Sequence, residues 1–102
     1  MNWYTYILRC SNGSFYVGHT NSVENRFARH LQKSGARHTA SYEPERIEYT
    51  EEFDSEKEAI RRERQIKKWT RAKKTALINK DFEQLKALSK SSFNRAFQAL
   101  AN

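Results

Sequence analysis

The stretch from Thr5 to His30 limits the possible folds most, because its pattern predicts a β-hairpin followed directly by a helix. Residues 4–8 are mostly aromatic or β-branched, which suits a half-buried strand, and residues 15–20 supply a return strand. Asn12 and Gly13 lie between the two strands and tolerate positive φ angles, so they predict a tight turn. Two tyrosines, a glycine, an arginine and a histidine therefore meet in one small unit.

The helix after the hairpin is predicted from its cap and from its spacing. Asn21 is the expected N-cap, with Glu24 three residues later as its capping-box partner. Apolar side chains recur every four residues on one face, namely Val23, Phe27 and Leu31. An adjoining stripe carries the polar side chains Arg26, His30 and Lys33. This spacing predicts an amphipathic helix with a basic stripe beside its apolar face.

The order of these residues resembles that of the GIY-YIG nuclease superfamily. The second half of that motif is nearly intact as Tyr16-Val17-Gly18, whereas the first half keeps only its tyrosine, Tyr6, and has lost Gly-Ile. The remaining matches to the family pattern are Arg26 and His30 on the first helix and Glu63 on a later basic helix. The likeness runs from about residue 3 to about residue 78 and is greatest to small stand-alone bacterial members that consist of this domain alone.

The hairpin register tests this resemblance, because joint catalysis requires both tyrosines on one face of the sheet. A two-residue turn at Asn12 and Gly13 would send Tyr6 and Tyr16 to opposite faces. A three-residue loop with Gly13 as a left-handed bulge would instead place Tyr6 opposite Gly18, and Leu8 opposite Tyr16. We predict the second register.

The rest of the chain predicts one more strand and several capped helices. A loop is expected from about residue 34 to 45 and a third strand over 46–52. The expected helix caps are Ser55, for a helix to about Trp69, then Thr70, for a helix to about Asn79, and Asp81. These elements predict an α+β fold in β-β-α-β-α-α order, with a three-stranded, mainly antiparallel sheet flanked by helices. Residues 1–80 would form the nuclease-like domain, and residues 81–102 a C-terminal helical extension of that same domain.

The charge balance points to a polyanionic partner. The chain of 102 residues has a net charge of +7, and its residues 61–74 are basic with Glu63 as the lone acid. The single cysteine, Cys10, cannot form an internal disulfide, which favours a reduced, cytoplasmic setting. No apolar run approaches the about 20 residues of a membrane span, so no membrane partner is expected.

Glu63 occupies an unusual position for a carboxylate. On a helical wheel it lies within the apolar arc formed by Ala59, Ile60 and Ile66. A carboxylate on a core-facing stripe is costly unless it is paired or bound to a metal. One interpretation is a salt bridge to Arg26 or to a neighbouring base. The favoured one, which matches the superfamily's metal-binding glutamate, is a ligand for Mg²⁺ or Mn²⁺.

The resemblance implies a set of catalytic residues, namely Tyr6, Tyr16, Arg26, His30 and Glu63. Glu63 would hold the metal, and Arg26 would stabilise the developing negative charge. Tyr6 or Tyr16 would activate the water, with His30 as a hydrogen-bond partner or proton relay. Because free tyrosine has a pKa of ~10, nearby cations must lower the pKa of the tyrosine that acts as base.

Contacts to the substrate are expected around this set. Gly18 would leave room for a phosphate, and the basic stretch 61–74 would grip the strand backbone. The expected substrate-binding residues are Gly18, His19, Lys33, Arg37, His38, Arg62 and Lys67. The asparagine that many family members carry after the metal helix has no counterpart in residues 68–74.

These features together predict a metal-dependent endonuclease that cleaves DNA in preference to RNA, with structure-specific action in repair or recombination. The alternative is a non-catalytic nucleic-acid-binding module on the same fold, which the missing asparagine favours. A third hypothesis, a structural partner in a ribonucleoprotein, has only the charge in its support. The chain lacks the DNA-reading domain of larger members, so we expect a protein partner for targeting, or recognition of nucleic-acid shape alone.

Overall fold

The computed structural model describes residues 2–37 and 43–89, without the side chains of residues 33–37. One compact unit extends to Lys67, and a second begins at Lys68. The first unit contains β1 (Trp3–Cys10), β2 (Phe15–Thr20), α1 (Val23–Arg37), β3 (Pro44–Phe53) and α2 (Glu56–Lys67). The second contains α3 (Arg71–Ile78) and a helical segment over residues 82–89.

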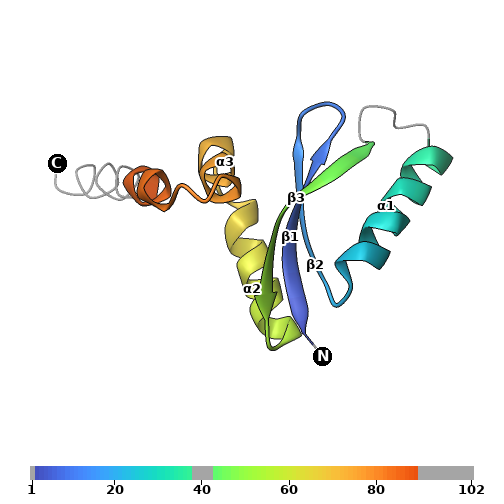
Figure 1. Cartoon of the computed structure of the whole chain (residues 1–102), viewed down its shortest axis with the longest axis horizontal. Coiled ribbons are helices and arrows are strands. Elements are labelled where there is room, and N and C mark those ends of the chain that lie inside the picture. Colours follow the sequence, from blue (N-terminus) through green and yellow to red (C-terminus); the bar gives the residue numbers. More distant parts are fainter. Residues whose placement is uncertain (1, 38–42, 90–102) are drawn as a thin grey trace. The chain divides into compact units, whose positions relative to one another are not determined.

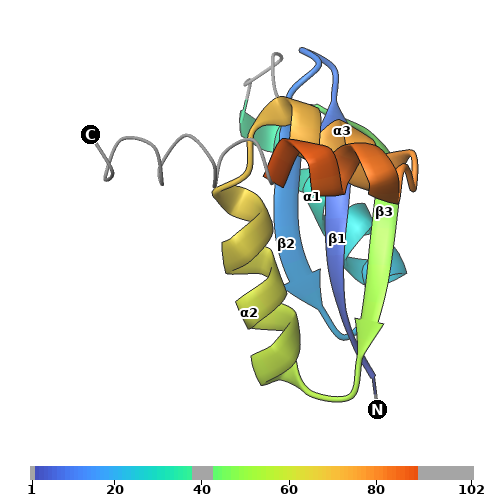
Figure 2. The same ribbon diagram turned by 90° about the vertical axis from the view of Figure 1, so that its left-hand side faces the viewer.

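The first unit is a three-layer arrangement around a small sheet. The strand order is β2-β1-β3, and β1 is antiparallel to both of its neighbours. Helix α1 covers one face of the sheet and α2 the other (Figure 1). Figure 2 shows α2 running alongside β2, the edge strand of the hairpin. The predicted α+β fold with a three-stranded antiparallel sheet is therefore confirmed.

The hairpin adopts the predicted register. Tyr6 lies opposite Gly18, and Leu8 lies opposite Tyr16. The loop is closed by the Gly13 N–H, which donates to the Cys10 carbonyl at 2.9 Å, and Gly13 has a φ of 84°. A left-handed glycine of this kind adds one residue to the turn and resets the pairing of the two strands. Both tyrosines consequently project from the same face of the sheet.

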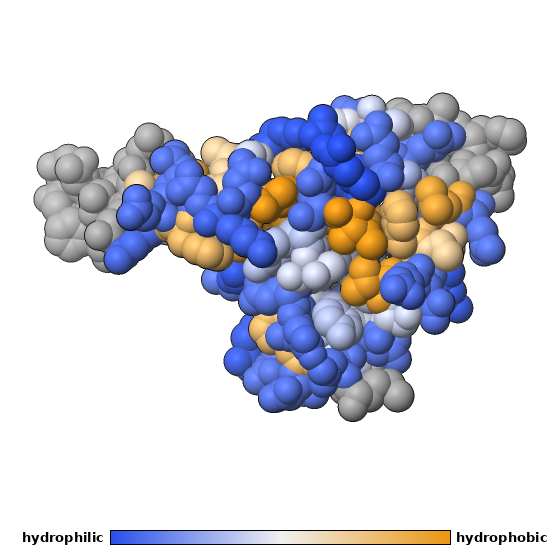
Figure 3. Space-filling view, in the orientation of Figure 1, coloured by the Kyte–Doolittle hydropathy of each residue, from blue (hydrophilic) through white to orange (hydrophobic). Residues whose placement is uncertain are grey.

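The interior of the first unit is built around the middle strand. Residues 5–8 of β1 are all buried, because the strand is covered on both faces. On the α2 face, the Thr5 hydroxyl donates to the Ala59 carbonyl at 2.8 Å, and Ala59 is fully buried. On the other side, apolar residues gather between the sheet and α1 in a surface that is otherwise mostly hydrophilic (Figure 3). No helix within the described ranges is long and apolar enough to cross a bilayer.

Three of the four predicted helix caps are confirmed. The side chains of Ser55, Thr70 and Asp81 accept hydrogen bonds from backbone N–H groups three residues later, at 3.3, 3.3 and 3.2 Å. The predicted cap at Asn21 is wrong. Ser22 caps α1 instead, since its hydroxyl accepts from the Asn25 N–H at 3.4 Å and its carbonyl accepts from the Arg26 N–H at 3.0 Å. The Thr20 hydroxyl hydrogen-bonds the backbone of Ser22 and so fixes the start of the helix there.

The predicted loop over residues 34–45 is mostly wrong in its bounds. Helix α1 continues through Gly35 to Arg37, and β3 already begins at Pro44. A single glycine inside a helix costs only about 1 kcal/mol, which a long amphipathic helix can absorb. Pro44 is tolerated as the first residue of an edge strand because no ladder hydrogen bond is required of its nitrogen. Helix α2 also ends earlier than predicted, at Lys67.

Candidate active site

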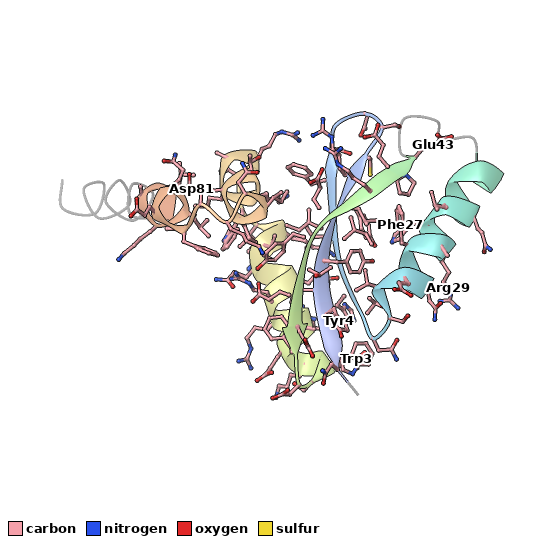
Figure 4. All side chains as sticks on the ribbon, in the orientation of Figure 1. Trp3, Tyr4, Phe27, Arg29, Glu43 and Asp81 are labelled. Carbon is pink, nitrogen blue, oxygen red and sulfur yellow. The ribbon has the colours of Figure 1, made fainter. Side chains whose placement is uncertain are left out.

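The Tyr6 hydroxyl is the meeting point of the candidate active site. Tyr6 lies on β1 and is only 2% exposed. Its hydroxyl oxygen is 3.2 Å from Nε2 of His30 and accepts a hydrogen bond from Nε of Arg26 at 3.4 Å. Arg26 and His30 are four residues apart on α1, so they lie on the same side of that helix. Phe27, from the same helix, also points toward the sheet (Figure 4).

Gly18 makes this position of Tyr6 possible. A Cβ atom at residue 18 would lie 2.5 Å from the Tyr6 hydroxyl oxygen and 2.7 Å from the ring carbon that carries it. Real Cβ atoms do not approach other atoms so closely, so a larger residue at position 18 would force the buried Tyr6 ring to shift. The space at Gly18 that was predicted to receive a phosphate is therefore occupied by Tyr6.

Tyr16 packs against Tyr6 and His30 and is the most exposed of these three side chains. It is 41% exposed, and its ring centroid lies 4.9 Å from that of His30, with the two rings nearly perpendicular. The Tyr6 and Tyr16 ring centroids are 6.3 Å apart. Distances and angles in these ranges are typical of edge-to-face and tilted aromatic packing. The packing keeps Tyr16 beside His30 while a large part of its surface remains accessible.

The pKa of Tyr6 is raised above its ordinary value, contrary to the expectation that cations would lower it. Burial is the largest cause, because it disfavours the phenolate. The hydrogen bond from Arg26 works in the opposite direction and is outweighed, while the charges of Tyr16 and Glu63 add to the rise. The pKa of Arg26 is also raised, first by its hydrogen bond to Tyr6. At neutral pH Tyr6 is therefore a protonated phenol beside a guanidinium cation.

Glu63 lies within the apolar arc of α2, as its helical position predicted. Ala59 and Ile66 are fully buried on either side of it, and the Glu63 side chain is 14% exposed. Its Oε1 is 3.2 Å from Nδ1 of His19, and its Oε2 is 3.5 Å from Nζ of Lys67. The carboxylate is thus paired with neighbouring bases.

His19 extends the charged cluster on the α2 side of the sheet. Its other ring nitrogen, Nε2, is 3.8 Å from Oε2 of Glu56, and its ring lies against Trp3 with centroids 6.0 Å apart. Successive residues of a strand face opposite sides, so His19 and Gly18 diverge. His19 was expected to contact the substrate, whereas its side chain contacts Glu56, Glu63 and Trp3 within the described residues.

Glu63 offers a single carboxylate for a hard divalent cation, on the α2 side of the sheet, where it is also paired with His19 and Lys67. Mg²⁺ is commonly bound by one or two carboxylates, with water and substrate phosphate completing the octahedron. Glu63 can offer one such carboxylate. Within the described residues no cluster of three or more His, Cys, Asp or Glu side chains has the arrangement of a metal site.

The other residues expected to bind substrate either pair with groups of the protein itself or have side chains that the structure does not describe. Nε of Arg62 donates to Oε2 of Glu51 at 3.2 Å, and Nη1 donates to Oε1 of Gln65 at 2.8 Å. Lys33 and Arg37 lie in α1, but their side chains are among those not described, and His38 lies outside the described residues.

Sequence patterns did not single out Asn25, Arg29 and Gln32, which line a cavity beside Arg26. Their spacing of four and three residues along one side of α1 was the available signal.

The chain is similar to known proteins over most of its length. The family model of the GIY-YIG catalytic domain matches residues 2–76. A UPF0213 protein of Halobacterium salinarum is 43% identical over 75 residues, which cover 74% of this chain and 97% of that protein. The solution NMR structure of a UPF0213 protein from Bacillus halodurans is 40% identical, with a TM-score of 0.50, and covers 78% of this chain and 84% of that one. The chain therefore belongs to the GIY-YIG family of nucleases.

Proposed function

We propose that this protein is an endonuclease that hydrolyses phosphodiester bonds in DNA, with Mg²⁺ or Mn²⁺ as its cofactor. The observation that carries the proposal is the convergence of Arg26 and His30 on the Tyr6 hydroxyl, within a fold of the nuclease family. Hydrolysis of a phosphodiester needs a route for the proton of water and a cation for the developing negative charge. These three side chains supply both.

The proton route runs through Tyr6 to His30. Because its pKa is raised, Tyr6 is protonated at neutral pH and is not a ready-made base. Its hydroxyl can accept a proton from water only as it gives its own to Nε2 of His30, 3.2 Å away. The O–H bond of water breaks, a new O–H bond forms on Tyr6, and His30 becomes an imidazolium. This relay requires the His30 tautomer with the hydrogen on Nδ1.

Arg26 and Tyr16 form the side of the site that would meet the phosphate. Arg26 holds its Nε on Tyr6, so its terminal nitrogens are oriented before substrate arrives. A guanidinium fork matches the geometry of phosphate oxygens and does not titrate in the physiological range. The exposed Tyr16 hydroxyl can then donate to a non-bridging oxygen or to the attacking water.

Glu63 would hold the divalent metal, which neutralises charge on the phosphate and assists the leaving oxygen when it is bound. His19 acts through Glu63: its Nδ1–H donates to Oε1 and fixes the direction of the carboxylate. Residues that orient a metal ligand in this way are often nearly as important as the ligand itself. This role replaces the direct substrate contact expected of His19.

The remaining basic residues would bind the strand on either side of the cut. Lys33, Arg37, His38, Arg62 and Lys67 are proposed for this role from their charge. Contacts of this kind set affinity and salt dependence and carry little sequence information. Structure-specific cleavage in repair or recombination, with a partner protein for targeting, remains the proposed biological setting.

The test is a cleavage assay on branched, nicked, single-stranded and RNA substrates with Mg²⁺ or Mn²⁺. Wild type should cleave DNA, whereas Arg26→Ala and Glu63→Gln should lose at least about 100-fold in rate, as removal of one charge-stabilising group commonly does. Both variants should still bind the oligonucleotide. Glu58→Gln, which removes an exposed carboxylate from the same helix, is the matched control and should cleave like wild type.

His19→Ala separates orientation from substrate binding. It should raise the Mg²⁺ concentration for half-maximal rate about tenfold or more, since loss of an orienting partner typically costs 10- to 100-fold. Oligonucleotide affinity measured in EDTA should not change. Cleavage that survives both Arg26→Ala and Glu63→Gln would refute the assigned site, and a wild type that binds without cutting would favour the non-catalytic binding module.

A further inference from the structure

A polar cavity lies next to Arg26, along the first part of α1. Its volume is about 460 Å³, and it is lined by the turn between β2 and α1 and by Asn25, Arg26, Arg29 and Gln32 of α1. Apart from Ala28, every lining residue is polar or charged. The described residues that line it include two arginines and no carboxylate, so the cavity is electropositive.

Several basic side chains of this unit are neutralised by nearby glutamates. Arg9, Arg46, Arg62 and Lys67 each pair with a glutamate. Within the described part of the chain, the side chains of Asn25, Arg29 and Gln32 have no such partner and no hydrogen bond. Figure 4 shows Arg29 on the side of α1 that faces away from the sheet. Its guanidinium is therefore available to an external anion.

Arg26 links this cavity to the candidate active site. Its Nε donates to Tyr6, while the same side chain forms part of the cavity wall. Arg29 follows three residues later, and side chains at this spacing have Cβ atoms roughly 5–6 Å apart on one side of a helix. Two anionic groups bound by Arg26 and Arg29 would consequently be adjacent groups of one ligand.

We propose that this cavity binds the phosphate next to the one held by Arg26 on the same nucleic-acid strand. The inference rests on the proposed nuclease function and extends it, because it fixes the path of the strand along the outer side of α1. A nucleobase site would offer an aromatic face, and none of the described lining residues is aromatic. Amide and guanidinium donors suit phosphate and sugar oxygens instead.

The inference is tested by DNA binding in EDTA, measured by fluorescence anisotropy over a range of salt concentrations. Arg29→Ala should weaken binding about tenfold, and the slope of log K against log salt should become shallower by roughly 0.7 to 0.9, as for one lost phosphate contact. Lys57→Ala is the matched control. It removes one exposed positive charge from α2, on the other face of the sheet, and should leave the slope unchanged.

The position of the contact is tested with oligonucleotides that carry one neutral methylphosphonate. Neutralising the phosphate beside the scissile one should weaken wild-type binding about as much as Arg29→Ala does. The two changes combined should cost little more than either alone, since they remove the same contact. Independent, additive losses, or a wild-type salt slope in Arg29→Ala, would overturn the inference. A wild type that binds neither DNA nor RNA would overturn the nuclease proposal itself.

Discussion

Tyr6 lies opposite Gly18, and its ring occupies the space that a side chain at position 18 would need. Its hydroxyl lies where a Cβ atom of residue 18 would be, and from there it reaches both Arg26 and His30. The glycine in this motif therefore determines the position of the phenol to which we assign the proton relay. A substitution at residue 18 should therefore change the position of the Tyr6 hydroxyl before it affects other groups of the site.

Gly18→Ala should displace the Tyr6 ring and lower the cleavage rate about 100-fold, because small misplacements of reacting groups are that costly. The same overpacking should lower the free energy of unfolding by about 1–3 kcal/mol. Gly13→Ala is the control: Gly13 has a φ of 84° and open space around it. It should cost about 1 kcal/mol of stability through backbone strain and leave the rate near wild type. Equal losses of rate in the two variants would contradict this role for Gly18.

Motif and spacing brought together residues that are distant in sequence, but they did not predict the chemistry of the group. Tyr6, Arg26 and His30 were selected in this way, and both Arg26 and His30 lie within hydrogen-bond distance of the Tyr6 hydroxyl. The expectation that cations would lower the pKa of the tyrosine acting as base does not hold for Tyr6, because burial outweighs the hydrogen bond from Arg26 and raises its pKa. Burial is set by how strands and helices pack, which local sequence does not state.

At the scale of secondary-structure elements, the hairpin turn and three of the four helix caps were predicted correctly, whereas several element boundaries were not. The hairpin register was predicted correctly from the turn at Gly13, because the type of turn determines how the two strands pair. The end of α1 and the start of β3 were predicted wrongly, because Gly35 indicates a helix stop whereas α1 continues through it to Arg37 and β3 begins at Pro44. The N-cap of α1 was displaced by one residue, from Asn21 to Ser22.

The cap assignment can be checked by a pair of alanine substitutions. Ser22→Ala removes the hydroxyl that accepts from the Asn25 N–H, and it should lower the free energy of unfolding by about 1 kcal/mol. Asn21→Ala should cost clearly less. Urea unfolding followed by circular dichroism measures both. A larger loss for Asn21→Ala would restore Asn21 as the cap.

At the scale of the whole molecule, global stability should depend on alkaline pH. Tyr49 of β3 donates to Oε2 of Glu51 at 2.7 Å, and the same oxygen accepts from Arg62 of α2 at 3.2 Å. Burial, followed by the hydrogen bond and the charge of Glu51, raises the pKa of Tyr49 to about 12. The group therefore links β3 to α2 most strongly while the phenol is protonated.

This shift has a defined sign in the unfolding equilibrium. From pH 10 to about 12 the unfolded chain loses the Tyr49 proton while the folded chain keeps it, so the free energy of unfolding should fall. Below that window the contribution is fully present. Tyr49→Phe should show a shallower decline over the same pH range, in urea titrations followed by circular dichroism. Parallel curves for the two proteins would rule out the contribution of Tyr49.

The distribution of charge over the whole molecule was the least predictable feature. The basic stretch 61–74 is expected to bind DNA, and two of its cations, Arg62 and Lys67, also form ion pairs with Glu51 and Glu63. Partners that are distant in sequence decide which cations are available, and spacing along one helix does not reveal them. Arg29, which sequence patterns did not single out, faces outward from α1 and has no ion pair with another described residue.

Tyr6 is part of the hydrophobic interior and, in the proposed mechanism, of the reacting group, whereas Tyr16 is partly exposed to solvent. Selection for a folded chain alone would preserve the first of these tyrosines in a lineage that had given up cutting DNA. The second would be free to drift. Relatives that had lost nuclease activity would therefore be recognised by substitutions at position 16. A tyrosine retained at position 6 would not by itself indicate an active nuclease.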